Sequence, residues 1–236
     1  MPFGFWYWDP TYIIVLPALL LVLWAQWRVQ ATFQEWSRRW SSRGLTGAQV
    51  ARAILDRAGL HDVGVEPIPG HLTDHYDPRD RVLRLSQSVY HSSSVAAIGV
   101  AAHEAGHAIQ HDVGYVPLMM RSAFVPLANL GSTGGPLLFV LGLFFPRGIG
   151  DWMMQTGILL FGLAVLFYII TLPVEFNASS RALAILEGQG YLVGEELRGA
   201  RAVLWAAAMT YVASAAMAIS QLLRLLAIRG LYRDED

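Results

Sequence analysis

The sequence predicts a mainly α-helical membrane protein with three to four transmembrane helices and a small α+β domain. Of the 236 residues, 54% are hydrophobic and only 15% are charged, which is unusual for a soluble globular protein. Long apolar stretches supply the candidate spans, and a polar stretch between them is rich in charged residues. These changes in composition divide the chain into four consecutive segments: 1–43, 44–115, 116–173 and 174–236.

The composition also excludes several classes of function. Cysteine is absent, so neither disulfides nor thiolate metal ligands are available. All 17 basic residues are arginine, and a chain without lysine cannot form the Walker A loop that binds nucleotide phosphates. The net charge of −1 gives no electrostatic reason to expect nucleic acid as a partner.

Residues 12–27 form the first apolar stretch and are predicted to anchor the chain in the membrane. Trp8 precedes the stretch and further tryptophans close it, as expected of aromatic belts at the two interfaces of a bilayer. Arginines follow the stretch rather than precede it, which argues against a cleaved signal peptide. Among these arginines, Phe33, Trp36 and Trp40 fall at helical spacing and predict a helix lying at the membrane surface.

The polar segment 44–115 is expected to fold as a small α+β domain. It opens with a short amphipathic helix that Thr46 can cap and that ends at Gly59. Residues 63–68 and 81–86 have the composition and alternation of strands. The second of these strands either packs within the domain or presents an edge that pairs with an extended peptide by β-augmentation.

Three further apolar stretches follow the polar segment. Residues 152–172 carry no charge and predict a transmembrane helix. Residues 117–145 are long enough to span the membrane but contain glycines and prolines, which predict a kink. Residues 202–223 are rich in the small side chains that let membrane helices approach closely. This last stretch is either a fourth span or an amphipathic helix packed on the others.

Arginine placement predicts the orientation of the chain. Most arginines outside the spans lie on the same side as the polar segment: Arg28, Arg38, Arg39, Arg43, Arg181, Arg198 and Arg201. Because positively charged loops stay inside the cell, the polar segment is expected to face the cytoplasm.

Residues 95–111 form an apolar helical segment that carries a recognisable chemical motif. His103, Glu104 and His107 make the arrangement H-E-x-x-H. Residues four apart share a helix face, so the two imidazoles can bind one ion, and zinc suits two such nitrogens plus a carboxylate and a water. Glu104 is rotated away from that face and is the predicted general base. Gly106 is expected to keep the helix surface low, where a substrate backbone could approach.

A zinc site needs a third protein ligand. His111 lies about 12 Å from His103 along the helix axis, too far to share one ion with it. Glu175 directly follows a predicted span, and a carboxylate in that position needs a partner such as a metal. Glu175 is therefore the predicted third ligand, and Ser179, one turn later, could support the site. The alternative is an interfacial glutamate that pairs with Arg181.

Together the two motifs resemble those of a known family. H-E-A-G-H-A-I-Q-H, then hydrophobic spans, then P-V-E-F-N-A-S-S-R-A-L is similar to the YugP-type neutral zinc metallopeptidases, a bacterial membrane family related to the HtpX and CAAX-prenyl-protease group. The resemblance covers nearly the whole chain. It implies a gluzincin-like peptidase in which His103, His107 and Glu175 hold one Zn²⁺ per chain and Glu104 is the catalyst. The chain departs from the HtpX group at Ser179, where an aspartate is usual.

Two other classes of protease share part of the pattern. H-E-A-G-H also occurs in FtsH-type proteases, but those need an ATPase module that a lysine-free chain cannot supply. Site-2-type proteases take their third ligand from an L-D-G-type motif. Here Leu55 and Asp56 are followed by Arg57 and precede the zinc-motif helix, so this class does not fit.

The predicted function is that of an integral membrane zinc endopeptidase of a bacterial cell membrane. Its expected partners are a protein or peptide substrate and the lipid bilayer, without nucleic acid or nucleotide. The alternative is a non-catalytic membrane scaffold that uses zinc structurally, although such sites usually fill all four positions with protein ligands. Other candidates to support the ligands or stabilise an oxyanion are Asn177, Arg181, Tyr191, His75 and Tyr76.

Overall fold

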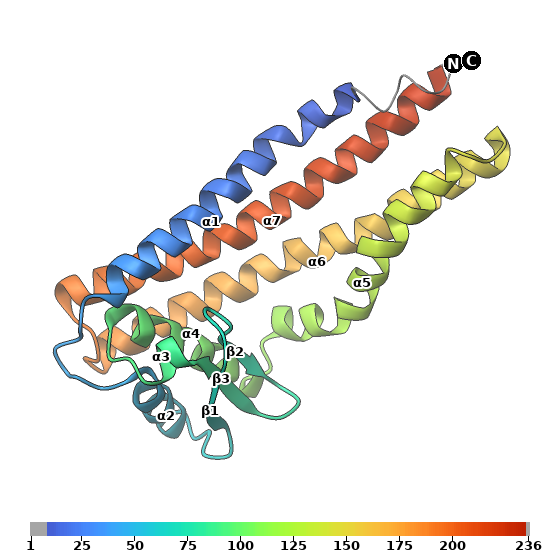
Figure 1. The fold of residues 1–236 in the computed structure, drawn as a ribbon. Helices are drawn as coiled ribbons and strands as arrows, with labels where there is room; N and C mark the ends of the chain where they lie inside the picture. Colours follow the sequence, from blue (N-terminus) through green and yellow to red (C-terminus); the bar gives the residue numbers. More distant parts are fainter. Residues whose placement is uncertain (1–8, 235–236) are drawn as a thin grey trace. The chain divides into compact units, whose positions relative to one another are not determined.

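The computed structural model describes residues 9–234, so Trp8, predicted to belong to an aromatic belt, lies outside the described residues. The described chain is mainly helical and carries one small sheet (Figure 1). The elements in chain order are a 3-10 turn Pro10–Ile14, α1 Leu16–Ser37, α2 Gly47–Arg57, β1 Gly64–Ile68, β2 His75–Asp77, β3 Val82–Ser86, α3 Gln87–Tyr90, α4 Val95–Asp112, α5 Val116–Gly142, α6 Arg147–Gly188 and α7 Gly194–Asp234.

The chain forms two compact units. The first consists of Met1–Trp24, Met120–Leu172 and Tyr211–Asp236, and the second of Ala25–Met119 and Pro173–Thr210. Residues 173–210 are therefore grouped with the polar segment, although the 53 residues 120–172 separate them in the sequence. The candidate site lies wholly within the second unit.

Three described helices are long and apolar enough to cross a membrane: Val116–Gly142, Gly148–Gly188 and Gly194–Tyr232. The prediction of three to four spans is confirmed, with three candidate spans among the described residues. The stretches that form them are partly different from those predicted. The undecided stretch 202–223 belongs to one of them, whereas the predicted anchor 12–27 does not. The physical reason is that the polar residues Gln26, Arg28 and Gln30 lower the mean hydropathy of α1.

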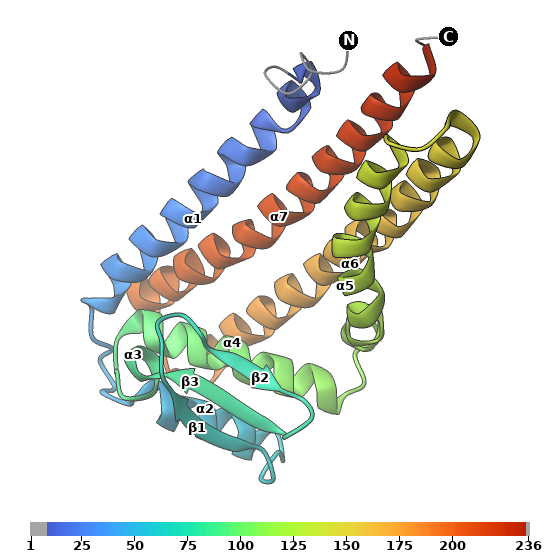
Figure 2. The same ribbon diagram turned by 45° about the vertical axis from the view of Figure 1, so that its right-hand side comes forward.

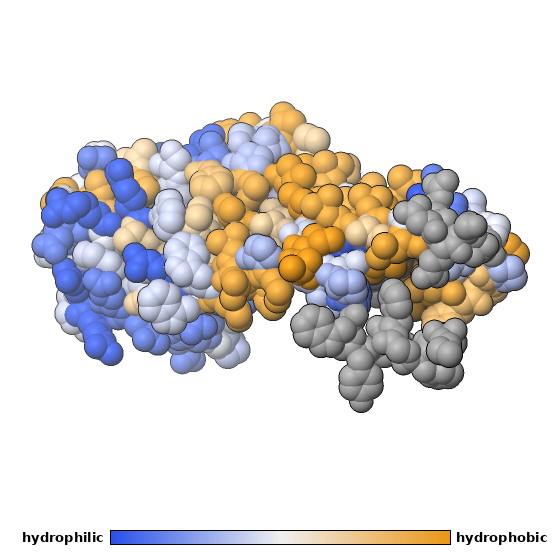
Figure 3. All heavy atoms as spheres, turned by 90° about the horizontal axis from the view of Figure 1, so that it is seen from above, coloured by the Kyte–Doolittle hydropathy of each residue, from blue (hydrophilic) through white to orange (hydrophobic). Residues whose placement is uncertain are grey.

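In the first unit, α5 and α6 form an antiparallel pair with their backbones in close contact. A Cβ atom on Gly135 would lie 2.7 Å from the carbonyl oxygen of Gly157, so the glycines that predicted a kink also allow direct helix contact. Large apolar side chains on these helices are exposed, and Figure 3 shows hydrophobic residues gathered over part of the face that it draws. Exposed apolar surface of this extent marks a site of membrane contact.

The second unit contains a three-stranded sheet packed against α4. The strand order is β1-β3-β2, with β1 parallel and β2 antiparallel to β3 (Figure 2). The prediction that residues 81–86 could offer a free edge is wrong, because β3 has a strand on each side. The edge beside α4 belongs to β2, a strand of three residues that the sequence pattern did not predict.

The strand β3 contributes to the core of this unit, and four of its five residues are buried. Leu83 and Leu85 are fully buried, as are Ile54 of α2 and Ile98 of α4. The predicted surface helix around Phe33 is also corrected, because α1 continues unbroken to Ser37 and Phe33 is only 3% exposed within this core. Aromatic residues at helical spacing predict an apolar face equally well for lipid and for protein contact. Here the protein core covers Phe33 and contacts Trp36, whereas Trp40 lies after the helix and is exposed.

Small residues bring α4 against α6. A Cβ atom on Gly106 would lie 2.9 Å from the backbone oxygen of Ala178. The prediction that Gly106 leaves room for a substrate is therefore wrong, because α6 occupies that side of the helix. The close approach has a consequence for the site, since Ala178 is three residues from Glu175.

Candidate metal centre

Local interactions hold α4 at both ends. At its start, the Ser94 side chain accepts a hydrogen bond from the Ala97 N–H, and the Val95 N–H donates to the Arg39 carbonyl at 2.9 Å. At its end, Gly114 adopts a φ of +62°, the left-handed conformation that commonly terminates helices. The chain segment after α1 thus caps the helix that carries the H-E-x-x-H motif.

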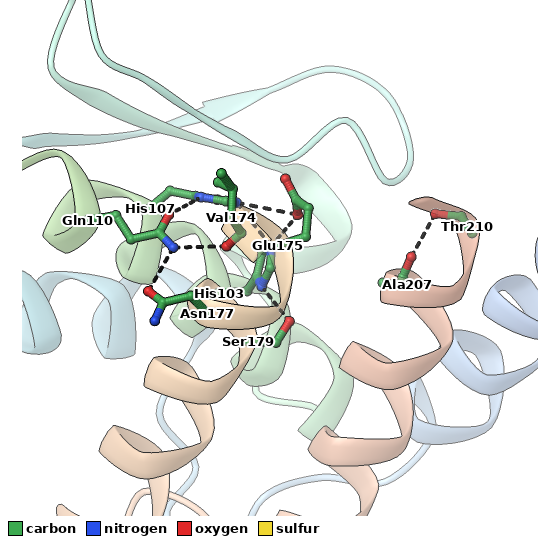
Figure 4. Close-up of polar contacts among 9 residues, drawn as sticks. All are labelled: His103, His107, Gln110, Val174, Glu175, Asn177, Ser179, Ala207 and Thr210. Carbon is green, nitrogen blue, oxygen red and sulfur yellow. Dashed lines mark hydrogen bonds and ion pairs between the residues drawn. The ribbon is translucent and has the colours of Figure 1, made fainter. Parts of the chain in front are cut away.

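His103, His107 and Glu175 converge in the buried junction of α4 and α6 (Figure 4). The two Nε2 atoms lie 3.1 Å apart, and Glu175 Oε2 lies 3.3 Å from His103 Nε2 and 3.6 Å from His107 Nε2. Glu175 is 2% exposed and His107 is 7% exposed. Two residues on one helix and a third 72 positions after His103 thus bring three potential ligand atoms together.

The spacing of these atoms fits a small tetrahedral cation. Zinc bound at 2.0–2.1 Å by nitrogen and oxygen ligands in tetrahedral geometry would hold its donor atoms about 3.3 Å apart. The three observed separations, 3.1, 3.3 and 3.6 Å, lie on either side of that value. Two imidazole nitrogens and one carboxylate oxygen are also the donor types that zinc accepts. The residues present therefore fit the metal that the motif predicts.

Glu104, the predicted general base, is buried on α4 and follows His103 directly in the sequence. Burial, together with the negative charges of Glu175 and Asp74, raises the pKa of its carboxyl group to about 7 against the opposing influence of His103 and His75. A carboxylate with a pKa near the working pH is well suited to transfer protons.

The raised pKa predicts an unusual pH dependence for the metal-free protein. Between pH 4.5 and about 7, folded Glu104 holds a proton that unfolded Glu104 has lost, so the free energy of unfolding should fall as pH rises through that window. The whole shift corresponds to roughly 3 kcal/mol. Glu104→Gln should therefore melt above wild type at pH 8 and close to it at pH 4.5, as measured in detergent with EDTA. A difference that is constant across this range would contradict the prediction.

Several other predicted site residues form hydrogen bonds with the predicted ligands or with one another. Ser179 Oγ lies 3.1 Å from His103 Nδ1. Asn177 Oδ1 accepts hydrogen bonds from Arg181 Nε at 2.8 Å and from the side chain of Gln110 at 2.9 Å. Arg181 thus contacts Asn177, and the Glu175 carboxylate contacts both histidines.

The remaining candidates for an oxyanion donor have contacts with other residues. The Tyr76 hydroxyl is 2.8 Å from His111 Nδ1, which links β2 to α4 and gives His111 a partner other than a metal. His75 is exposed on β2, and its Nδ1 lies 2.9 Å from the Thr73 carbonyl. Tyr191 is 4% exposed in the core of the second unit, with the guanidinium groups of Arg43 and Arg57 over its ring.

Sequence reasoning did not single out Gln110. This residue is fully buried, and its Oε1 lies 2.9 Å from His107 Nδ1. One signal was available, because Gln110 follows His107 by three residues and so shares its helix face. An amide on the ligand face of an apolar helix is a candidate partner for a ligand.

Comparison with known proteins identifies the family. The family described as "Putative neutral zinc metallopeptidase" matches residues 11–230. The chain belongs to this family. It is also 47% identical over 224 residues to "Putative membrane protease YugP" of Bacillus subtilis (strain 168), which covers 94% of this chain and 98% of that relative. No solved structure matches the chain. The resemblance predicted from the two motifs is confirmed, and the neutral zinc metallopeptidase family implies zinc as the metal.

Proposed function

We propose that this neutral zinc metallopeptidase homologue is a membrane-embedded endopeptidase of the gluzincin type. His103, His107 and Glu175 hold one Zn²⁺, and Glu104 is the general base. The observation that carries the proposal is the convergence of the H-E-x-x-H histidines with a carboxylate from α6, at 3.3 and 3.6 Å. Three protein ligands leave a fourth position for water and substrate, as catalytic zinc sites do.

The proposed peptide hydrolysis depends on proton transfer by Glu104 and on the burial of its carboxylate. Zinc, when bound, polarises a carbonyl group and makes a water molecule more acidic. Glu104 accepts the proton of that water at its carboxylate and passes it to the nitrogen of the leaving amine. Burial at 8% exposure keeps bulk water from this carboxylate, and a low local dielectric strengthens its electrostatic interactions.

Two features support a peptide as the substrate. The outer edge of β2 lies beside α4 (Figure 2), where an extended peptide could add as a further strand. A cavity of about 400 Å³ lies between α6 and α7, next to Ser179, and its apolar wall includes Phe176, Leu183, Leu204 and Trp205. Such a cavity suits an apolar side chain of the substrate.

The membrane context narrows the substrate class. Three helices can span a bilayer, and the relative from Bacillus subtilis is named as a membrane protease. We infer that the substrates are membrane-associated proteins or peptides. The arginines that flank the spans favour a bacterial cell membrane protein whose site faces the cytoplasm.

Removal and return of the metal test the proposal. The full-length protein, purified in detergent, should cleave a fluorogenic library of unstructured peptides. Cleavage should stop after dialysis against a chelator and return with one equivalent of zinc, because binding of the metal completes the site. Cleavage that persists in the chelated protein would contradict the proposal. Zinc binding at one equivalent with no cleavage of peptides or of membrane proteins would favour the non-catalytic scaffold.

A further inference from the structure

A buried amide joins the two helices that carry the predicted ligands. Gln110 of α4 is fully buried, and its Oε1 lies 2.9 Å from His107 Nδ1. Its Nε2 lies 2.8 Å from the backbone oxygen of Val174 and 2.9 Å from Asn177 Oδ1. These last two residues flank Glu175 on α6 (Figure 4), so one side chain contacts both a histidine and the backbone that carries the glutamate.

The partners at the two ends of this network determine the direction of every hydrogen bond. A backbone carbonyl can only accept, so the amide nitrogen of Gln110 must face Val174 and its oxygen must face His107. At the other end, Arg181 Nε can only donate, so the oxygen of Asn177 must face Arg181 and can also accept from Gln110. The orientation of both amides, which electron density alone rarely distinguishes, therefore follows from the chemistry of their partners.

This direction determines where His107 carries its proton. Because the Gln110 oxygen can only accept, a hydrogen bond at 2.9 Å requires a proton on Nδ1 of His107. The neutral ring then has its lone pair on Nε2, which is the atom directed at His103 and Glu175. A histidine that binds metal through one nitrogen commonly donates its other N–H to such a partner.

We propose that Gln110 is a positioning residue that prepares the site before metal binds. It holds the proton of His107 on Nδ1, and it holds α6 in the register that brings Glu175 to the histidines. The proposal rests on the function proposed above for His103, His107 and Glu175 as ligands. Gln110 acts through these residues and does not itself contact a metal or a substrate.

His103 provides an internal comparison. Its Nδ1 lies 3.1 Å from Ser179 Oγ, and a hydroxyl can either donate or accept. Ser179 therefore permits either tautomer of His103, whereas Gln110 permits only one tautomer of His107. The two histidines should nevertheless differ in the metal-free protein: His107 carries its proton on Nδ1, whereas His103 donates from Nε2 to the Glu175 carboxylate at 3.3 Å.

Three variants test the two parts of the proposal. Gln110→Met keeps most of the volume and removes every hydrogen bond. Gln110→Glu keeps an acceptor for His107 but cannot donate to Val174 or Asn177 when ionised. Gln189→Met is the matched control, because it makes the same chemical change in the second unit at a glutamine whose Oε1 has no hydrogen-bond partner among the described residues.

The readouts are the zinc dissociation constant, by competition with a chromogenic chelator, and the histidine tautomers, by ¹⁵N NMR of the metal-free protein. Wild type should show His107 with its proton on Nδ1. Gln110→Met should show both tautomers and bind zinc 10–100-fold more weakly, the range for residues that support metal ligands. Gln110→Glu should keep the tautomer yet melt at a lower temperature without metal. Gln189→Met should bind zinc as wild type does.

Two results would overturn the proposal. One is a proton on Nε2 of His107 in the wild-type protein, a measurement that does not depend on whether any variant folds. The other is a Gln110→Met protein that folds and binds zinc within twofold of wild type. Neither readout uses a substrate, so absence of cleavage would count against the endopeptidase function alone.

Discussion

Glu104→Gln is expected to abolish peptide cleavage and to leave zinc binding intact. A glutamine occupies the same volume but cannot accept a proton from water, and a positioned general base contributes a factor of 10²–10⁴ to rate. The predicted ligands His103, His107 and Glu175 are unchanged, so the protein should still hold one zinc per chain. The measurement is kcat/KM for a cleaved peptide together with metal analysis of the same sample.

The matched control for this variant is Glu66→Gln, which makes the same change at an exposed position of β1. It should cleave at the wild-type rate. Activity of Glu104→Gln within tenfold of wild type would remove Glu104 from the mechanism. Loss of zinc together with activity would instead assign Glu104 a role in holding the metal, contrary to its rotation away from the two histidines.

The parts of the site that sequence analysis could predict are local or come from strong topological constraints. The two histidines lie one helical turn apart, so their convergence needs only the helix that their apolar neighbours predict. Glu175 was predicted because a carboxylate at the end of a predicted membrane helix needs a partner. A pair of spans before it would bring it back to the side of the polar segment. The family match and the three candidate spans agree with this outline.

The missed parts depend on contacts between segments that sequence spacing does not encode. Gln110 connects α4 to α6 by hydrogen bonds to Val174 and Asn177, which are 64 and 67 residues away in the sequence. A periodic pattern cannot reveal such partners. The same limitation explains why the prediction for Gly106 is wrong, because its neighbour is the backbone of α6 and not a substrate.

Strand order was likewise beyond the sequence pattern. The pattern of residues 81–86 predicted a strand correctly, but not its burial, since four of the five residues of β3 are buried. Centre and edge strands of a small sheet can also share the same alternation. The three residues of β2 are too few to show a period. The position of β2 is defined by its pairing with β3 and by the contact of Tyr76 with His111, neither of which the sequence pattern shows.

Glu175→Ala is expected to reduce zinc binding more than any change in the surrounding network. Removal of a supporting residue typically costs 10–100-fold in metal affinity, whereas removal of a ligand leaves only two imidazoles to hold a doubly charged ion. The loss of zinc affinity should therefore exceed the upper end of that range, roughly 100-fold. Purified protein should contain little zinc.

Two companion variants separate ligand loss from misfolding. Glu187→Ala removes an exposed glutamate twelve residues later on the same helix and should retain wild-type zinc content. Glu175→Gln keeps the shape of the side chain and removes its charge, so it should fold with α6 in place and still bind zinc weakly. Unchanged zinc content in Glu175→Ala would show that the carboxylate at 3.3 Å from His103 is only a hydrogen-bond partner of the histidines, and the endopeptidase function would then lack its third ligand.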